Sequence, residues 1–280
     1  MTDRSFAVIK VGGSILREEA SYRSGARRLA EEFARGPTWA VVSAGRGITD
    51  ALERLCRRGD AREVQSFLHR EAEVTGVRPT PLLEADLWRG LHAARCGVRD
   101  RLLAWGERAS AEALRVHLSE AGAEVPLVEL STAPPTHVRR AAIVPGFYVR
   151  DRGGRIRCLP RGGSDISAVL VAAQLHARQV RFWKEGGGVR AYGEIVPEIE
   201  ASVLLPRLSR TIRPLQPAAV LLASRRGIDL VLEDPFGRHA PTRIVSRAVD
   251  RSDGLRPPPP PELGRRVPVS SPLAVVGDPR

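Results

Sequence analysis

The sequence predicts an α/β fold in which an open, mostly parallel sheet is flanked by helices, as in an αβα sandwich. Two apolar runs, residues 6–11 and 39–42, read as buried strands. Each strand ends in a glycine-bearing turn, and an amphipathic stretch typical of a helix follows. Because ligands of open α/β sheets bind beyond the carboxyl ends of the strands, we expect a site at these turns.

The next elements follow in chain order. After the first turn we expect a helix through Phe33, and after the second a mostly helical region over residues 50–104 that caps the substrate side. Pro79-Thr80-Pro81 interrupts that region. A further helix is predicted over residues 106–122, and a strand over residues 125–130.

The second half of the chain continues this alternation of elements. A hairpin is predicted from residues 143–148 and 155–158, because glycines in the turn between them allow a positive φ. An apolar helix and two further strands are expected, at residues 166–175, 179–184 and 228–233. These elements predict one domain over residues 1–245. Residues 246–280 contain five consecutive prolines and are expected to form an extended or disordered tail without a second folded regulatory module.

Composition narrows the function classes. The 280 residues carry a formal charge of +12, but basic residues are scattered among acids and no basic run is interleaved with aromatics, so nucleic acid is not an expected partner. No apolar run approaches the roughly 20 residues that span a bilayer, and no secretory leader is apparent, which favours a cytoplasmic protein without a membrane partner. The three cysteines lie far apart, so neither a disulfide framework nor a metal site is expected from protein ligands.

Lysine is almost absent from this basic chain. Of 44 lysines and arginines, only Lys10 and Lys184 are lysine. A compact ammonium can approach phosphate oxygens through a narrow gap, whereas a guanidinium is a broad planar fork. Both lysines lie in candidate phosphate sites, although chance retention is an alternative explanation.

Four glycine-rich tips recur at predicted strand or helix ends. Glycines let backbone N–H groups approach phosphate oxygens, and a following helix N-terminus adds partial positive charge. The tips match neither the Walker A spacing nor the dinucleotide-binding spacing. They predict a phosphate-handling α/β enzyme, with ordinary tight turns as the alternative. The tips are Gly12-Gly13, Gly45 to Gly47, Gly162-Gly163 and Gly186 to Gly188.

Several motifs, in order, resemble those of aspartokinase catalytic domains in the amino-acid-kinase superfamily. The similar segments are K-V-G-G-S (10–14), V-V-S-A-G-R-G-I-T-D (41–50), G-E-R-A-S (106–110), P-G-F (145–147), R-G-G-S-D-I-S-A (161–168), W-K-E-G-G-G-V (183–189), L-Q-P (215–217) and the closing region 226–244. The resemblance covers about residues 6–245 and implies the amino-acid-kinase fold. It also implies ATP-dependent phosphorylation, with Mg²⁺, of a carboxylate of aspartate or a related amino acid to an acyl phosphate. A homodimer is a further implication.

The resemblance also implies roles for individual residues. Lys10 and Asp165 are expected to be catalytic, although an aspartate at a helix start is alternatively an N-cap. The substrate contacts are expected to include Glu107 for an α-ammonium and Arg161 for an α-carboxylate, with a surface ion pair and an exposed turn arginine as the alternatives. The full substrate set is Ser43, Thr49, Glu107, Arg161 and Ser164; the nucleotide set is Lys10, Gly12, Gly13, Lys184, Glu185, Gly188 and Arg213.

The nucleotide half departs from the family pattern. Gly187 stands where the family has a second acid, residues 191–194 replace a downstream D-P-R, and Arg213 replaces a lysine. Two alternatives to the aspartate kinase therefore stay open. One is a catalytically impaired protein that binds or senses an amino acid, and the other is a kinase for a different small carboxylate or a phosphorylated acceptor.

Overall fold

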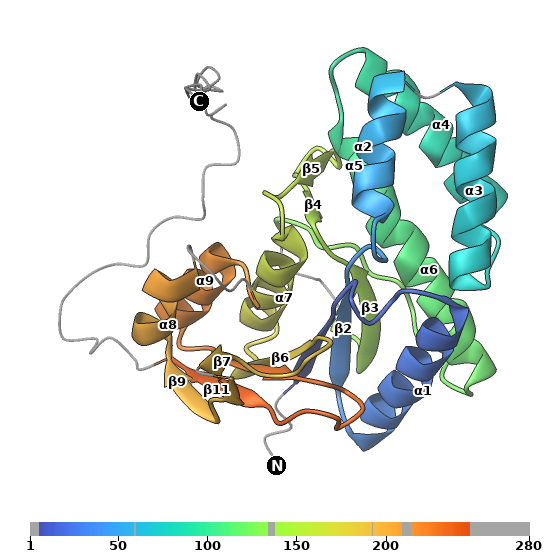
Figure 1. Cartoon of the computed structure of the whole chain (residues 1–280). Coiled ribbons are helices and arrows are strands. Elements are labelled where there is room, and N and C mark those ends of the chain that lie inside the picture. Colours follow the sequence, from blue (N-terminus) through green and yellow to red (C-terminus); the bar gives the residue numbers. More distant parts are fainter. Residues whose placement is uncertain (1–5, 59, 134–137, 192, 209–213, 247–280) are drawn as a thin grey trace, which may run out of the picture. The chain divides into compact units, whose positions relative to one another are not determined.

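The structure is a computed structural model that describes residues 6–58, 60–133, 138–191, 193–208 and 214–246 (Figure 1). These residues belong to one compact unit, which spans residues 1–248. The predicted tail lies outside the described residues, apart from Ser246. None of the helices in the described ranges combines the length and apolarity needed to cross a bilayer.

A seven-stranded sheet forms the centre of the unit, in the order β3-β2-β1-β6-β10-β11-β9. All neighbouring strands pair in parallel except β10 and β11, which are antiparallel. This arrangement confirms the predicted open, mostly parallel sheet. The strands are β1 (Ala7–Val11), β2 (Thr38–Val42), β3 (Ala141–Pro145), β6 (Gln179–Trp183), β9 (Glu198–Glu200), β10 (Asp229–Glu233) and β11 (Thr242–Val245).

Helices cover both faces of this sheet because successive side chains of a strand point to opposite faces. Val8 and Val41 pack into one apolar cluster with residues of α7 and α9, whereas Ile9 and Val42 pack into another with residues of α1 and α6. Strands buried on both faces read as continuous apolar runs, which is why 6–11 and 39–42 could be recognised. The covering helices are α1 (Glu19–Arg35), α6 (Trp105–Glu120), α7 (Gly163–Gln174), α8 (Ala201–Leu208) and α9 (Pro217–Arg226).

A helical lobe stands above the carboxyl ends of the strands (Figure 1). It consists of α2 (Ile48–Arg58), α3 (Ala61–Thr75), α4 (Pro81–Arg95) and α5 (Asp100–Leu103), packed around its own apolar cluster with Trp105. The predicted interruption at residues 79–81 is the start of α4, where Thr80 caps the N–H of Leu83 and Pro81 occupies the first turn.

Two predictions of local structure are wrong. Residues 125–130 do not form a strand; a single bridge joins Leu127 to Ile143, and Pro126 has no N–H to extend the ladder. The first strand of the hairpin is also misplaced, because residues 141–145 belong to the main sheet as β3. The hairpin instead joins β4 (Tyr148–Arg150) to β5 (Ile156–Cys158). The short strands β7 (Arg190–Ala191) and β8 (Glu194–Ile195), with β9 and α8, were not predicted.

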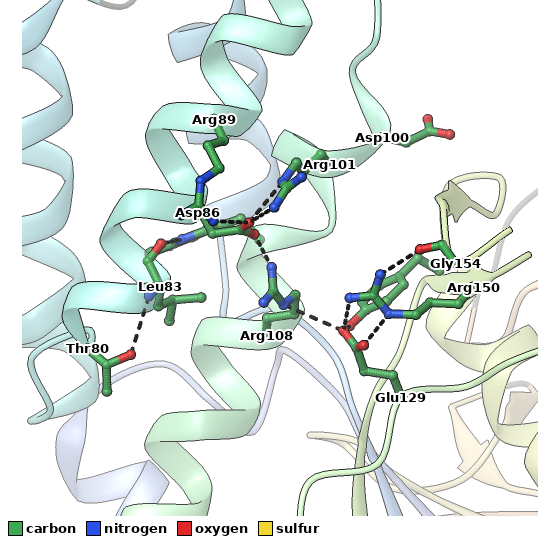
Figure 2. A network of polar contacts seen from close by, with 12 residues as sticks. Thr80, Leu83, Asp86, Arg89, Asp100, Arg101, Arg108, Glu129, Arg150 and Gly154 are labelled. Atoms are coloured by element: carbon green, nitrogen blue, oxygen red, sulfur yellow. Dashed lines mark hydrogen bonds and ion pairs between the residues drawn. The ribbon is translucent and has the colours of Figure 1, made fainter. Parts of the chain in front are cut away.

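A buried carboxylate joins the helices of the lobe to one another and to the hairpin (Figure 2). Asp86 of α4 accepts hydrogen bonds from Arg101 of α5 and from Arg108 of α6. Arg108 lies 3.7 Å from Glu129, which also binds Arg150 and the hydroxyl of Tyr148 in β4. Asp86 therefore fixes the junction of α5 and α6, directly before the segment that carries Glu107.

Replacing Asp86 with Asn should destabilise the protein. The amide keeps the size of the carboxyl but removes the charge that Arg101 and Arg108 share, so we expect the free energy of unfolding in urea to fall by about 1–3 kcal/mol. Glu31→Gln is the matched control, because Glu31 is 58% exposed and pairs with Arg28 and Arg35 only at the surface. Its effect should stay below about 0.5 kcal/mol. Equal effects of the two substitutions would contradict this assignment.

Candidate active site

The predicted site residues come from the loops at one edge of the sheet. Lys10 lies near the end of β1, where it pairs in register with Val41 of β2 and Phe182 of β6. Lys184 directly follows β6, and Ser43 directly follows β2. Parallel pairing of the three strands thus brings these side chains to a common edge, as the sequence predicts. The N-terminus of α7 supplies Ser164 and Asp165, and the first turn of α6 supplies Glu107.

Asp165 binds both lysines of the chain. Its Oδ1 lies 3.0 Å from Nζ of Lys10, and its Oδ2 lies 3.3 Å from Nζ of Lys184. Oδ2 also accepts the N–H of Gln216 at 3.0 Å, and the ammonium of Lys184 donates to the carbonyl of Pro214. The helix begins at Gly163, so Asp165 lies inside its first turn, and the N-cap is Gly162. The N-cap alternative for Asp165 is therefore excluded.

Burial and the neighbouring charges have opposing effects on the pKa of Asp165 and on the pKa of Lys184. Burial alone would raise the pKa of Asp165, but the two ammonium groups outweigh it and lower that pKa. Burial, assisted by repulsion from Lys10, lowers the pKa of Lys184 to about 8 in spite of Asp165. Two ammonium groups against one carboxylate leave a local excess of positive charge, which suits a phosphate group.

Glu107 is a buried carboxyl group that forms no ion pair with the residues that the structure describes. It lies in the first turn of α6 and is 3% exposed. Its Oε1 accepts a hydrogen bond from Ser164 at 3.5 Å, and the hydroxyl of Ser164 accepts one from Ser43 at 3.2 Å. Its Oε2 has no hydrogen-bond partner in the part of the chain that the structure describes. The surface-ion-pair alternative for Glu107 is therefore wrong.

The environment of Glu107 favours its protonated form. Burial raises the pKa of Glu107 to about 8, although the N–H of Ala44, the charge of Lys10 and the hydroxyl of Ser164 act to lower it. A buried carboxyl that is costly to ionise, with one oxygen that has no partner among the described residues, is suited to a ligand that brings a positive charge.

Arg161 and Thr49 lie outside this buried cluster. The side chain of Arg161 is 68% exposed and forms ion pairs with Asp50 at 2.6 Å and Glu53 at 3.3 Å, both on α2. Thr49 is half-buried in the first turn of α2. The structure therefore shows Arg161 as an exposed arginine that bridges the loop before α7 to α2. Its role as a carboxylate ligand stays a prediction.

Gly12 and Gly13 are required by close backbone packing. The N–H of Gly12 donates to the carbonyl of Trp183 at 3.1 Å, and a Cβ on Gly12 would lie 2.8 Å from that oxygen. A Cβ on Gly13 would lie 2.5 Å from the carbonyl oxygen of Ala44. Any larger residue would push the turn away from Trp183 or Ala44. These glycines keep the turns after β1, β2 and β6 close together. Packing alone requires glycine at both positions, and the same arrangement is compatible with phosphate binding.

The nucleotide half has its own loop geometry. Glu185 donates its N–H to Ser14 at 3.2 Å and pairs at the surface with Arg17 at 3.1 Å. Gly187 has a φ of +66°, and a Cβ there would lie 2.7 Å from Cβ of His239. An acid at this position would therefore be strained. Gly188 donates its N–H to the carbonyl of Ala240 at 3.2 Å. Arg213 lies outside the described residues.

Two features of this edge were not predicted. Gln216 holds Asp165 through its backbone N–H, and its place in the L-Q-P motif was the available signal. Ser110 accepts the N–H of Gly45 at 2.9 Å. It follows Glu107 by three residues and so lies on the same side of α6. Its place in the G-E-R-A-S motif was the available signal.

Comparison with known proteins points to one family. A model of the amino acid kinase family matches residues 5–234. An aspartokinase of Thermus thermophilus is 26% identical over 262 residues, which cover 88% of this chain and 60% of that protein. An aspartokinase of Rickettsia felis is 29% identical over 136 residues, which cover 46% of this chain and 32% of that protein. The chain thus spans no more than 60% of the length of these curated relatives.

Solved structures share the fold. Aspartokinase III of E. coli, solved in complex with lysine and aspartate, superposes with a TM-score of 0.67 at 19% identity, over 87% of this chain and 66% of that one. Aspartate kinase of Clostridium acetobutylicum gives 0.67 at 17% identity, over 88% and 63%. N-acetylglutamate synthase of Neisseria gonorrhoeae gives 0.53 at 13% identity, over 87% and 62%. These similarities confirm the predicted fold class.

The scarcity of lysine makes the charge of Lys184 directly measurable. In protein labelled with ¹³C at the lysine Cε, only two side-chain signals are expected, from Lys10 and Lys184. One of them should titrate near pH 8, because burial lowers the pKa of Lys184. Asp165→Asn should lower this midpoint further, because it removes the charge that favours the ammonium form. Lys184→Arg assigns the signal. If the signal that disappears in Lys184→Arg has a midpoint near 10.5 in the parent protein, the burial of Lys184 in the triad is contradicted.

Proposed function

This chain belongs to the amino acid kinase family, and we propose that it transfers the γ-phosphate of ATP to a carboxylate of aspartate or a closely related amino acid, forming an acyl phosphate. The main support is that a cationic site and an acidic site lie at the same edge of the sheet. One is the buried cationic triad of Lys10, Asp165 and Lys184, and the other is the buried carboxyl of Glu107, whose Oε2 has no partner among the described residues. The similarity to two aspartokinases supports the choice of acceptor.

The amino-acid half of the proposed reaction uses Glu107 and its neighbours. The α-ammonium of the acceptor would pair with Glu107, whose Oε2 has no partner among the described residues. The hydroxyl groups of Ser43 and Ser164 lie next to that carboxyl and can bind polar groups of the same ligand. Thr49 and Arg161 complete the proposed set. Arg161 would exchange its exposed ion pairs with Asp50 and Glu53 for the α-carboxylate.

The phosphate half uses charge and alignment. A carboxylate nucleophile is ionised at pH 7, so its attack on phosphorus requires no general base. Lys10 and Lys184 would neutralise the transferring phosphate, and the N-terminus of α7 adds partial positive charge. Asp165 holds both lysines in place. Gly12 and Gly13, with Glu185, Gly188 and Arg213, complete the proposed nucleotide set.

The residues present fit ATP with magnesium. Two buried ammonium groups and a cluster of glycine turns suit a polyphosphate. No cluster of three His, Cys, Asp or Glu side chains suited to a metal ion occurs within the described ranges. Both oxygens of Asp165 are engaged by the lysines and Gln216. This suits magnesium, which keeps several waters and binds through substrate phosphates, where it would supply further charge neutralisation.

One observation favours a second candidate, a protein that binds an amino acid without consuming ATP. Gly187 replaces an acid of the family pattern and occupies a backbone conformation that an acid would strain. A kinase for another small carboxylate or a phosphorylated acceptor is the third candidate. A homodimer and a cytoplasmic location are retained as parts of the first proposal.

Trapping of an acyl phosphate distinguishes these candidates. The chain is incubated with ATP, Mg²⁺ and hydroxylamine, together with aspartate, glutamate or another small carboxylate. The amounts of hydroxamate and ADP formed are then measured. We expect hydroxamate with aspartate or a close analogue. Lys10→Ala should lower kcat at least about 100-fold, since it removes a preorganised charge from the phosphate. Arg62→Ala, which removes an exposed charge on α3, is the control and should retain activity.

The other outcomes assign the other candidates. Saturable binding of an amino acid in calorimetry without hydroxamate from any acceptor would replace the kinase with the binding protein. Hydroxamate from a different acid would keep the kinase reaction and change only the proposed identity of the acceptor. An unchanged rate in Lys10→Ala would contradict the phosphate role of Lys10.

Amino-acid binding should depend on pH through Glu107. The free carboxyl is protonated below its pKa of about 8 and must lose that proton to pair with an ammonium group. The affinity for aspartate, measured by calorimetry without nucleotide, should therefore rise up to tenfold per pH unit below 8 and level off above it. Glu107→Gln should bind more weakly and show a flat profile between pH 6 and 9. The same slope in this variant would assign the titration to another group.

A further inference from the structure

Ser110 connects three segments that are far apart in the sequence. It is fully buried in α6, one turn after Glu107. Its Oγ accepts the backbone N–H of Gly45 at 2.9 Å and the hydroxyl of Tyr22 in α1 at 3.0 Å. A serine hydroxyl has two acceptor positions, and these two donors occupy both. The orientation of Ser110 is therefore set by Tyr22 and Gly45 together.

The loop that Ser110 holds carries part of the candidate amino-acid site. It runs from Ser43 to Gly47, between β2 and α2. Ser43 donates its N–H to Val11, and Arg46 donates its N–H to Leu16, so both ends of the loop are tied to β1 and the turn after it. Ser110 supplies the hydrogen bond in the middle. A displacement of Gly45 would move the hydroxyl of Ser43 and the N–H of Ala44, which face Ser164 and Glu107.

Packing leaves the loop little freedom around this bond. A Cβ on Gly45 would lie 2.8 Å from the hydroxyl oxygen of Tyr22, so the tyrosine contacts the loop as well as Ser110. Tyr22 is itself fully buried. Burial and the nearby charge of Glu71 raise the pKa of Tyr22, so its hydroxyl keeps the proton that it donates.

We propose that Tyr22 is a positioning residue that acts through Ser110 to hold the Ser43–Gly45 backbone against Glu107, and thereby sets the affinity of the amino-acid site. The effect on affinity rests on the proposed function, whereas the bracing of the loop is a property of the fold. Tyr22→Phe removes only the hydroxyl, which frees Ser110 to rotate away from Gly45. We expect a three- to tenfold loss of aspartate affinity, roughly the contribution of one hydrogen bond.

A double-mutant cycle tests whether Tyr22 acts through Ser110. The Kd for aspartate is measured for the parent, Tyr22→Phe, Ser110→Ala and the double variant. In the Ser110→Ala background, Tyr22→Phe should change the Kd less than twofold, because the group it acts through is gone. Tyr148→Phe is the matched control, since it removes another fully buried tyrosine hydroxyl, bound to Glu129 at 2.7 Å. Its effect should be the same in both backgrounds. Additive effects of Tyr22 and Ser110 would overturn the proposal.

Hydrogen exchange tests the brace without any ligand. In the unliganded protein, Tyr22→Phe and Ser110→Ala should each speed amide exchange in the peptide that covers residues 43–47, at least severalfold, whereas Tyr148→Phe should not. Unchanged exchange in Tyr22→Phe would overturn the proposal, even if Ser110→Ala fails to fold. Faster exchange in a protein that binds no amino acid would support the brace and contradict the proposed function alone.

Discussion

The rest of the site depends on one buried interaction, the contact of Asp165 with Lys10 and Lys184. Removing three charges from water is costly, and such a cluster persists only where its members satisfy one another with good geometry. Here the two carboxylate oxygens receive both ammonium groups and the N–H of Gln216. The lysines arrive from β1 and from the end of β6, and the aspartate from the first turn of α7. The triad therefore joins two neighbouring strands to the helix that covers them, and it contains both lysines of the chain.

The same edge of the sheet carries the cationic triad and a buried acidic side chain, Glu107. The triad has one positive charge in excess, whereas Glu107 is a carboxyl with an oxygen that lacks a partner among the described residues. The two sites are electrostatically coupled, since Lys10 lowers the pKa of Glu107. Under the proposed function, an anionic phosphate would balance the excess positive charge of the triad, and a cationic amine would pair with the open oxygen of Glu107. Close packing of Gly13 on the carbonyl of Ala44 keeps the two loops at a fixed separation.

Local patterns predicted most of this arrangement, and three-dimensional contacts account for the rest. The apolar strands were recognisable because both faces are buried, and the glycine turns because they end those strands. Parallel pairing then brings Lys10, Ser43 and Lys184 together without further information. The convergence of two lysines on Asp165 depends on how α7 packs on the sheet, which no local pattern encodes. The exposed position of Arg161 depends likewise on where α2 lies. The strand predicted at residues 125–130 does not form because Pro126 lacks an N–H. The prediction used the apolar pattern, which contains no information about backbone donors.

The departure of the nucleotide half from the family pattern is confined to residues after Lys184. The ammonium of Lys184 is held by Asp165 and the carbonyl of Pro214, whereas its backbone carbonyl accepts the N–H of Gly187 at 3.3 Å. Segment 239–242 also holds this loop: Gly188 donates its N–H to the carbonyl of Ala240, and Val189 donates its N–H to the hydroxyl of Thr242 at 2.8 Å. Gly187 and His239 are packed so closely that an acid at 187 would displace this segment. The glycine at 187 is thus required by the packing of this loop on segment 239–242, while the side chain of Lys184 keeps its contacts with Asp165 and Pro214.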